Sequence, residues 1–220
     1  MLGALATAWW LGRDRQHELP LTTRERRALS VAALAGAILG AKLPFWLLAA
    51  DRLSLGVALF ETHKTILGGL VGGYFGVEAA KWSLGLRLKT GDSFVVPVAA
   101  AIAVGRLGCL VGGCCFGVPT ALPWGMDFGD GVHRHPTQVY EFVFHLTAAV
   151  ALAALKQRGL FPRQLMKLYL LAYLGFRFAT EILRPEPRLV LGLTGYQLAA
   201  AALFPLFVAL WLADRRPRPA

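Results

Sequence analysis

Long apolar runs separated by short polar segments dominate the chain. Six runs are long enough to predict helices that cross a membrane, which takes about 20 residues. A seventh run, at the amino terminus, is shorter and predicts a clipped helix, a tilted helix or an interfacial anchor. The expected limits of the seven helices are residues 1–12, 28–50, 65–83, 94–111, 138–155, 164–183 and 196–213.

The composition supports a membrane protein. Of the 220 residues, 56% are apolar and 16% are charged, whereas a soluble domain carries about 25% charged residues. The mean hydropathy is +0.53. The 24 glycines fit this class, because small residues let membrane helices approach closely. We therefore expect an all-α fold, a polytopic bundle of about seven transmembrane helices that forms one domain over residues 1–220.

The net charge of +10 could indicate binding to nucleic acid, but basic residues that flank membrane helices on the cytoplasmic side explain it better. Alternate polar segments differ strongly in their content of lysine and arginine. One set holds 14 of these residues and the other holds 5; the sets are 13–27, 81–90, 156–163 and 214–220 against 51–64, 113–136 and 184–194. The first set is predicted to be cytoplasmic. The amino terminus is then outside, the carboxyl terminus inside, and segment 112–136 is an outer-face loop.

The run that begins at Phe94 contains an arginine, Arg106, and is followed by a polar segment rich in glycine and proline. A charge at the centre of a bilayer costs about 3 kcal/mol on an insertion scale, so intramembrane charges are functional candidates. Glycine allows close backbone approach and proline ends a regular helix. Non-helical backbone at membrane depth is tolerated only where it is buried in protein or lines a wet cavity. The segment after Arg106 is therefore a candidate site.

Two later helices carry charged residues at helical spacing. Arg177, Glu181 and Arg184 fall at i, i+4 and i+7, so they are predicted to share one helix face. They could form an ion pair between helices, or a clamp for an anion, since the arginine fork suits phosphate. Glu141 shares a face with Gln138 and is expected to pair with one of the arginines.

Other polar residues in the apolar runs have simpler explanations. Glu78 and Lys81 are expected to pair at i, i+3, and His145 is expected to have a hydrogen-bonded structural role. The three cysteines all lie between residues 109 and 115. Their spacing is poor for a structural zinc site, and free cysteines are commonly small packing residues. No metal is predicted.

The central segment also carries motifs. GRLGCLVGGCCFG at residues 105–117, PWG at 123–125 and RHPTQVYE at 134–141 resemble the signature of the prolipoprotein diacylglyceryl transferases. The resemblance implies a seven-helix membrane bundle in the bacterial cytoplasmic (inner) membrane, with its active site opening towards the outer leaflet. It implies transfer of the diacylglyceryl group from phosphatidylglycerol to the thiol of a lipobox cysteine, which forms a thioether and releases glycerol phosphate. The partners are phosphatidylglycerol and a lipoprotein precursor, with no cofactor.

The resemblance also assigns roles. Arg106 matches the essential arginine of the GR signature, and Arg177, Glu181 and Arg184 match the late R-x-x-x-E-x-x-R pattern. The candidate catalytic residues are Arg106, Arg177, His63 and His135. The candidate substrate-binding residues are Lys42, Gly68, Gly69, Cys109, Gly113, Gly117, Arg134, Gln138, Glu141, Glu181 and Arg184.

The chain departs from the family pattern in several places. The histidine of the family's HGGL motif is Leu67 here, with His63 one helical turn earlier, and the family's asparagine is Cys109. A general base is still needed, because the thiolate is the nucleophilic form of a thiol. We expect His63 to be that base, with His135 as the second candidate. Two other functions are also considered. One is a transferase with the same donor and a different acceptor, and the other is a non-catalytic lipid-binding or transport protein built on the same bundle.

Overall fold

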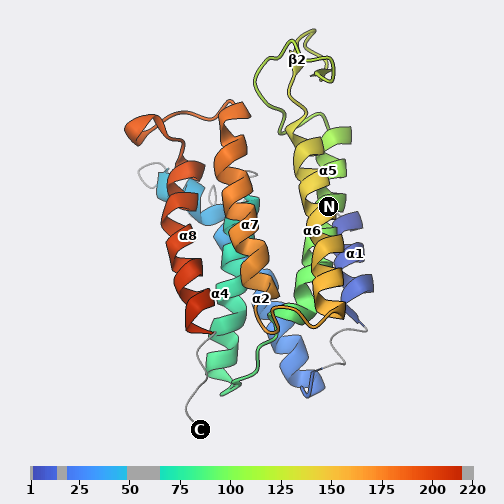
Figure 1. The fold of residues 1–220 in the computed structure, drawn as a ribbon, viewed down its shortest axis with the longest axis vertical. Coiled ribbons are helices and arrows are strands. Elements are labelled where there is room, and N and C mark those ends of the chain that lie inside the picture. Colours follow the sequence, from blue (N-terminus) through green and yellow to red (C-terminus); the bar gives the residue numbers. More distant parts are fainter. Residues whose placement is uncertain (1, 14–18, 49–64, 215–220) are drawn as a thin grey trace. The chain divides into compact units, whose positions relative to one another are not determined.

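The computed structural model describes residues 2–13, 19–48 and 65–214, which form seven α-helices, two short 3-10 helices and one small sheet (Figure 1). The α-helices are α1 (Leu2–Arg13), α2 (Thr23–Leu48), α4 (Ile66–Ser83), α5 (Gly91–Val111), α6 (Thr137–Gln157), α7 (Leu165–Thr180) and α8 (Gly195–Ala213). Each expected run coincides with one of them. The largest difference is at the start of α2, which begins at Thr23 rather than at residue 28.

The all-α membrane class is confirmed. Among the described residues, α2, α5, α6 and α8 are long and apolar enough to cross a membrane, whereas α1 and α7 have 12 and 16 residues. Large apolar side chains lie on the outside, such as Val111 at 91% exposure, while Gln138, His145 and Glu181 are fully buried. Lipid favours this arrangement, because polar groups must then find partners inside the protein.

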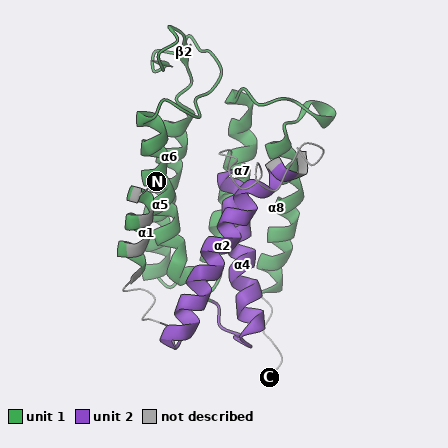
Figure 2. Cartoon of the chain, turned by 180° about the vertical axis from the view of Figure 1, so that it is seen from behind, with its two compact units in different colours: residues 1–18, 90–220 green, residues 19–89 purple. Residues whose placement is uncertain are grey.

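Two compact units make up the chain, residues 19–89 and residues 1–18 with 90–220 (Figure 2). The smaller unit contains α2 and α4, whose backbones touch through glycines. A Cβ added at Gly40 would lie 2.3 Å from the carbonyl oxygen of Gly68, and one at Gly72 would lie 2.2 Å from that of Gly36. Because only glycine fits such contacts, these positions decide how closely the two helices pack.

The smaller unit also holds three of the residues that the sequence singled out for substrate binding. Gly68 lies in the helix contact just described, and a Cβ on Gly69 would lie an ordinary 3.5 Å from the carbonyl oxygen of Ala37. Lys42 is buried near the end of α2. Glu78 and Lys81 form the expected i, i+3 ion pair at 2.7 Å. His63, the first candidate base, lies outside the described residues.

We expect Gly72→Ala to destabilise the smaller unit and its neighbour Gly73→Ala to leave it intact. An added Cβ at Gly72 meets backbone at 2.2 Å, whereas at Gly73 the nearest atom is 3.4 Å away. Overpacking of this kind costs about 1–3 kcal/mol, while alanine gains about 1 kcal/mol over glycine in a helix. Thermal unfolding in detergent measures both variants. Equal melting temperatures for the two would contradict the backbone contact.

In the larger unit, α5 packs against α1, α6 and α7, and α7 packs against α8 (Figure 1). The start of α7 is attached to α5 by Asp92, whose carboxylate accepts backbone N–H bonds from Arg163 at 2.5 Å and Leu165 at 3.0 Å. Thr194 caps α8 through a reciprocal pair of bonds with Gln197. The first attachment fixes the start of α7, which carries Arg177, and the second fixes the start of α8.

The segment between α5 and α6 is irregular, as expected, apart from one short hairpin of β1 (Met126–Asp127) and β2 (His133–Arg134). Gly113 and Cys115 have φ values of 60° and 64°, a left-handed conformation that glycine adopts easily and other residues seldom do. These two residues turn the chain sharply after α5. The turn brings the segment back onto α5 and the first turn of α6.

The end of α7 corrects one expectation. The helix stops at Thr180, and a 3-10 turn, η2 (Glu181–Leu183), follows. Arg184 is extended, with φ −104° and ψ 144°, so it does not continue the helix face that carries Arg177. Pro185 explains this, because a proline disfavours helical conformation in the residue before it.

Candidate active site

Two arginines from different helices share one carboxylate inside the larger unit. Glu141 on α6 accepts from Nη2 of Arg106 on α5 and, at 3.3 Å, from Nη1 of Arg177 on α7. All three side chains are buried, with exposed fractions of 2%, 7% and 4% for Glu141, Arg106 and Arg177. Glu141 was expected to pair with one arginine, and it pairs with two. The carboxylate therefore links α5, α6 and α7.

A second carboxylate extends this network towards α8. Glu181 lies 2.7 Å from Nη2 of Arg177 and accepts a 3.0 Å bond from the hydroxyl of Thr194. The guanidinium of Arg177 lies 4.5 Å from the ring centroid of Tyr196, which is cation–π distance. The expected ion pair of Arg177 with Glu181 and the pairing of Glu141 with two arginines are therefore parts of one buried network. We call the set Arg106, Glu141, Arg177 and Glu181 the buried ion network.

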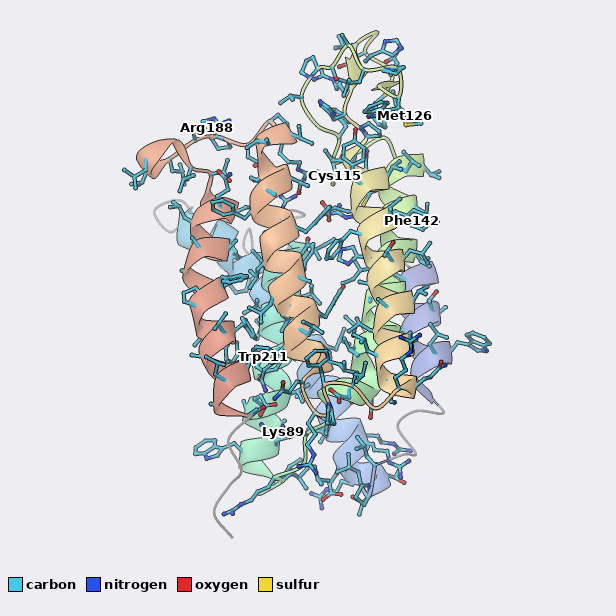
Figure 3. The ribbon with its side chains drawn as sticks, in the orientation of Figure 1. Lys89, Cys115, Met126, Phe142, Arg188 and Trp211 are labelled. Carbon is cyan, nitrogen blue, oxygen red and sulfur yellow. The ribbon has the colours of Figure 1, made fainter. Side chains whose placement is uncertain are left out.

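Arg184 lies past the end of α7 and reaches the turn after α5 instead. Its Nη1 donates to the carbonyl of Cys115 and, at 3.0 Å, to the hydroxyl of Thr137. Thr137 donates in turn to the same Cys115 carbonyl, and Gln138 donates to the carbonyl of Cys114, both at 2.6 Å. The side chains of α6 and Arg184 thus hold the backbone of the turn. In Figure 3, Cys115 lies beside the beginning of α6.

Two arginines of this region have buried N–H donors without a hydrogen-bond partner in the part of the chain that the structure describes. Arg106, Arg177 and Arg184 all lie close enough to Glu141 to stabilise its negative charge. Glu186 adds a third carboxylate near Glu181, so arginines and glutamates are equal in number here. Among the described residues, the Nε groups of Arg106 and Arg184 have no hydrogen-bond partner. A buried donor without a partner costs about 1–3 kcal/mol. An anion that accepted these N–H groups would remove that cost.

Gly117 is required at its position by close contacts. A Cβ on Gly117 would lie 2.4 Å from the carbonyl oxygen of Leu183 and 2.8 Å from Cβ of His135. The backbone N–H of Gly117 donates to the carbonyl of His135 at 2.8 Å. Gly117, a substrate-binding candidate, therefore lets the backbone of this segment approach the end of α7, and Gly113, another candidate, supplies the left-handed turn after α5.

The remaining candidates of the central segment form a separate polar group. Nδ1 of His135 lies 3.1 Å from the hydroxyl of Tyr140, which accepts a 2.9 Å bond from the indole of Trp124. Arg134 forms a 2.6 Å ion pair with Asp130 and lies over a phenylalanine ring. The Arg134 guanidinium lowers the pKa of the exposed Asp130 carboxyl through its hydrogen bonds. His135 thus has a partner that can orient its ring.

The three cysteines, expected to be packing residues, lie together. The sulfur atoms of Cys109, Cys114 and Cys115 are all within 4.8 Å of one another, and none forms a disulfide. A hydrogen bond from the Cys109 thiol, with the nearby positive charges of Arg106 and Arg184, lowers the pKa of Cys115 to about 5. Desolvation raises the pKa of Cys114.

Sequence reasoning missed two tyrosines beside the network. Tyr173 donates to Glu141 at 3.3 Å, and the hydroxyl of Tyr169 lies 2.8 Å from Nδ1 of His145. His145 is therefore hydrogen-bonded, as expected. Tyr169 and Tyr173 precede Arg177 by eight and four residues, so they share its helix face. That spacing was the available signal, and it was overlooked because tyrosines in an apolar run also fit ordinary packing.

Buried polar side chains in an apolar helical protein are typical of a membrane protein with an internal polar site. Comparison with known proteins gives the family. The family model "Prolipoprotein diacylglyceryl transferase" matches residues 1–213, and this chain belongs to that family.

The chain is similar to curated proteins named phosphatidylglycerol–prolipoprotein diacylglyceryl transferase. It is 34% identical to that of Cupriavidus pinatubonensis over 207 residues, which cover 86% of this chain and 74% of the relative. It is 32% identical to that of Bordetella parapertussis over 233 residues, covering 96% and 87%. For Clostridium tetani, the identity is 30% over 174 residues, covering 73% and 68%. The resemblance inferred from the central motifs is confirmed.

Proposed function

We propose that this chain is a transferase that moves the diacylglyceryl group of phosphatidylglycerol to the cysteine thiol of a prolipoprotein. The names of its relatives support the donor and the acceptor class. In the reaction, the acceptor sulfur forms a bond to the carbon of the diacylglyceryl group that is attached to the phosphate. The bond between that carbon and the phosphate oxygen breaks, glycerol phosphate leaves with the electron pair, and the thiol proton passes to a base.

The buried ion network is the main structural support for the proposal, because it indicates which residues act on the leaving group. Phosphate develops negative charge as its bond to carbon breaks, and fixed cationic donors in a dry site stabilise such charge. Arg106 is buried and has an Nε donor without a partner among the described residues. We propose that Arg106 and Arg177 stabilise the negative charge that develops on the leaving phosphate, and that Glu141 and Glu181 hold these arginines in place.

The other candidates have supporting roles in this proposal. The unpartnered Nε of Arg184 is a further donor for the phosphate. Gln138 and the glycines at 113 and 117 keep the turn after α5 in place, next to Cys109. Lys42, Gly68 and Gly69 belong to the smaller unit, and we propose them as contacts for lipid or leaving group on the family resemblance alone.

The base is expected to be a histidine, because an unperturbed pKa of about 6.5 suits proton transfer near neutral pH. We predict that His63→Ala abolishes transfer and that the exposed His133→Ala does not, at equal amounts of folded protein. Release of glycerol phosphate measures both. If His63→Ala is active and His135→Ala is inactive, His135 is the base. If His63→Ala and His135→Ala are both active, neither histidine takes the thiol proton.

We further propose seven crossings, with the amino terminus and segment 112–136 outside. The asymmetry of lysine and arginine supports this orientation. In a background without the three native cysteines, Asp130→Cys is expected to react with a membrane-impermeant maleimide added to intact cells. Arg158→Cys is expected to react only after permeabilisation. Reaction of position 158 in intact cells would reverse the orientation.

Purified protein tests the activity. With phosphatidylglycerol and a peptide that carries a lipobox cysteine, we expect release of glycerol phosphate that depends on the peptide thiol. A peptide with serine in place of that cysteine is the matched control. Equal release with both peptides would indicate a different acceptor, and no release with either would indicate lipid binding without catalysis.

A further inference from the structure

No step of the proposed reaction uses the three thiols of Cys109, Cys114 and Cys115 together, and the geometry of this cluster resembles that of a metal site. The sulfur atoms of Cys109, Cys114 and Cys115 lie within 4.8 Å of one another. A zinc ion bound at a Zn–S distance of about 2.3 Å holds its sulfurs about 3.8–4.0 Å apart in tetrahedral or trigonal geometry. Small rotations of the cysteine side chains are enough to reach that separation.

The backbone that carries these thiols is already held in place. The N–H of Cys114 donates to the carbonyl of Cys109 at 3.1 Å, which folds the turn back onto the last turn of α5. Gln138 and Thr137 bind the carbonyls of Cys114 and Cys115. A site built on backbone that is fixed before the ion arrives loses little conformational entropy when it binds.

The surroundings compensate the charge that three thiolates would carry. Nη1 of Arg106 is 4.0 Å from the sulfur of Cys109, within hydrogen-bond range for sulfur. Arg184 is bound to the carbonyl of Cys115. Three thiolates and a divalent ion carry one negative charge, and the guanidinium of Arg106 is a positive charge next to the sulfur of Cys109. Cys114 and Cys115 are exposed, so an ion can reach them from solvent.

The number and type of ligands decide which ion fits. Thiolates are soft ligands that select Zn²⁺, Cu⁺ and related thiophilic ions over Mg²⁺ or Ca²⁺. Three protein ligands leave the fourth position of a tetrahedral ion open, as in zinc sites that bind water. A disulfide would use only two of the three sulfurs, and the third would stay unpaired.

We propose that Cys109, Cys114 and Cys115 form a three-thiolate site for one thiophilic metal ion, Zn²⁺ or Cu⁺, which ties the turn after α5 to the end of that helix. This site does not depend on the proposed transferase activity, since binding is measured without donor lipid or acceptor peptide. The spacing of the cysteines in the sequence did not predict a metal site. The sulfurs come together through the sharp turn at Gly113 and Cys115, which the spacing does not reveal.

Metal binding to the reduced, untagged full chain in detergent tests the proposal. Protein incubated with Zn²⁺ and a phosphine reductant, and separately with Cd²⁺ as a spectroscopic substitute, is passed over a desalting column and analysed by elemental mass spectrometry. We expect one ion per chain, with a cadmium–thiolate charge-transfer band in the ultraviolet. Even the loss of an outer-shell partner weakens metal affinity about 10- to 100-fold, so Cys114→Ser is expected to weaken it at least as much.

Two controls make the result decisive. His133→Ala removes an exposed metal-binding side chain of the same segment and is expected to retain the ion. Circular dichroism of Cys114→Ser, whose side chain is exposed, verifies that the fold is kept. Substoichiometric binding by the reduced wild type, an unchanged affinity in Cys114→Ser, or binding without the charge-transfer band would overturn the proposal.

Discussion

Replacing Arg106 with lysine is expected to reduce turnover about ten-fold or more, which corresponds to about 1.4 kcal/mol of transition-state stabilisation. Lysine keeps the positive charge and can still pair with Glu141, so the protein should fold. Lysine loses the planar fork, and with it the second donor that arginine offers to a phosphate. The Nε of Arg106 is one of the buried donors without a hydrogen-bond partner among the described residues.

The comparison needs a matched control and separate rate constants. Arg158→Lys makes the same exchange at an exposed position at the end of α6 and is expected to keep wild-type activity. If Arg106 acts on the leaving group, kcat falls more than KM rises, because only transition-state binding is lost. Wild-type kcat in Arg106→Lys, at equal amounts of folded protein, would remove Arg106 from the reaction.

Replacing Glu141 with glutamine is expected to cause the largest loss of stability among these variants. Glu141 is 2% exposed and accepts from both Arg106 and Arg177. Without the charge of Glu141, the guanidinium of Arg177 keeps Glu181 as a partner, and that of Arg106 loses the carboxylate with which it is paired. Breaking a buried ion pair by removing one partner costs about 3–5 kcal/mol, which lowers the melting temperature of a chain of this size by roughly 10 °C.

Asp130→Asn is the matched control for the loss of a paired carboxylate. Asp130 forms an ion pair with Arg134 but is 44% exposed, and exposed pairs contribute only about 0–1 kcal/mol. Apparent melting temperatures in the same detergent compare the two variants. If Glu141→Gln melts as Asp130→Asn does, Glu141 is not the residue that links α5, α6 and α7.

The helices could be predicted from the sequence, because apolar runs in a membrane protein must satisfy their backbone groups internally. The pairing of Glu141 with an arginine also followed from composition, since a buried carboxylate needs a partner. Sequence could not give the second arginine, because nothing in a linear pattern places Arg106 and Arg177 on opposite sides of one carboxylate. That arrangement depends on how three helices pack.

Other features escaped prediction for local reasons. Arg184 was placed on the helix face of Arg177, but Pro185 ends the helix earlier. The sequence indicated only that the glycines at 36, 40 and 72 are small residues. Each of them contacts the backbone of the facing helix, and which residues face one another depends on how α2 and α4 are aligned. The three sulfurs meet because Cys115 adopts a left-handed conformation, which non-glycine residues seldom do and which sequence spacing does not reveal.

The mass of the acceptor peptide tests the central claim most directly. Purified protein is incubated with phosphatidylglycerol of one defined chain composition and a lipobox peptide, and the peptide is then analysed by tandem mass spectrometry. The account predicts a mass increase of one diacylglyceryl group, located on the cysteine as a thioether, and none on the serine peptide. An unmodified cysteine peptide in the presence of folded protein and intact donor would contradict it.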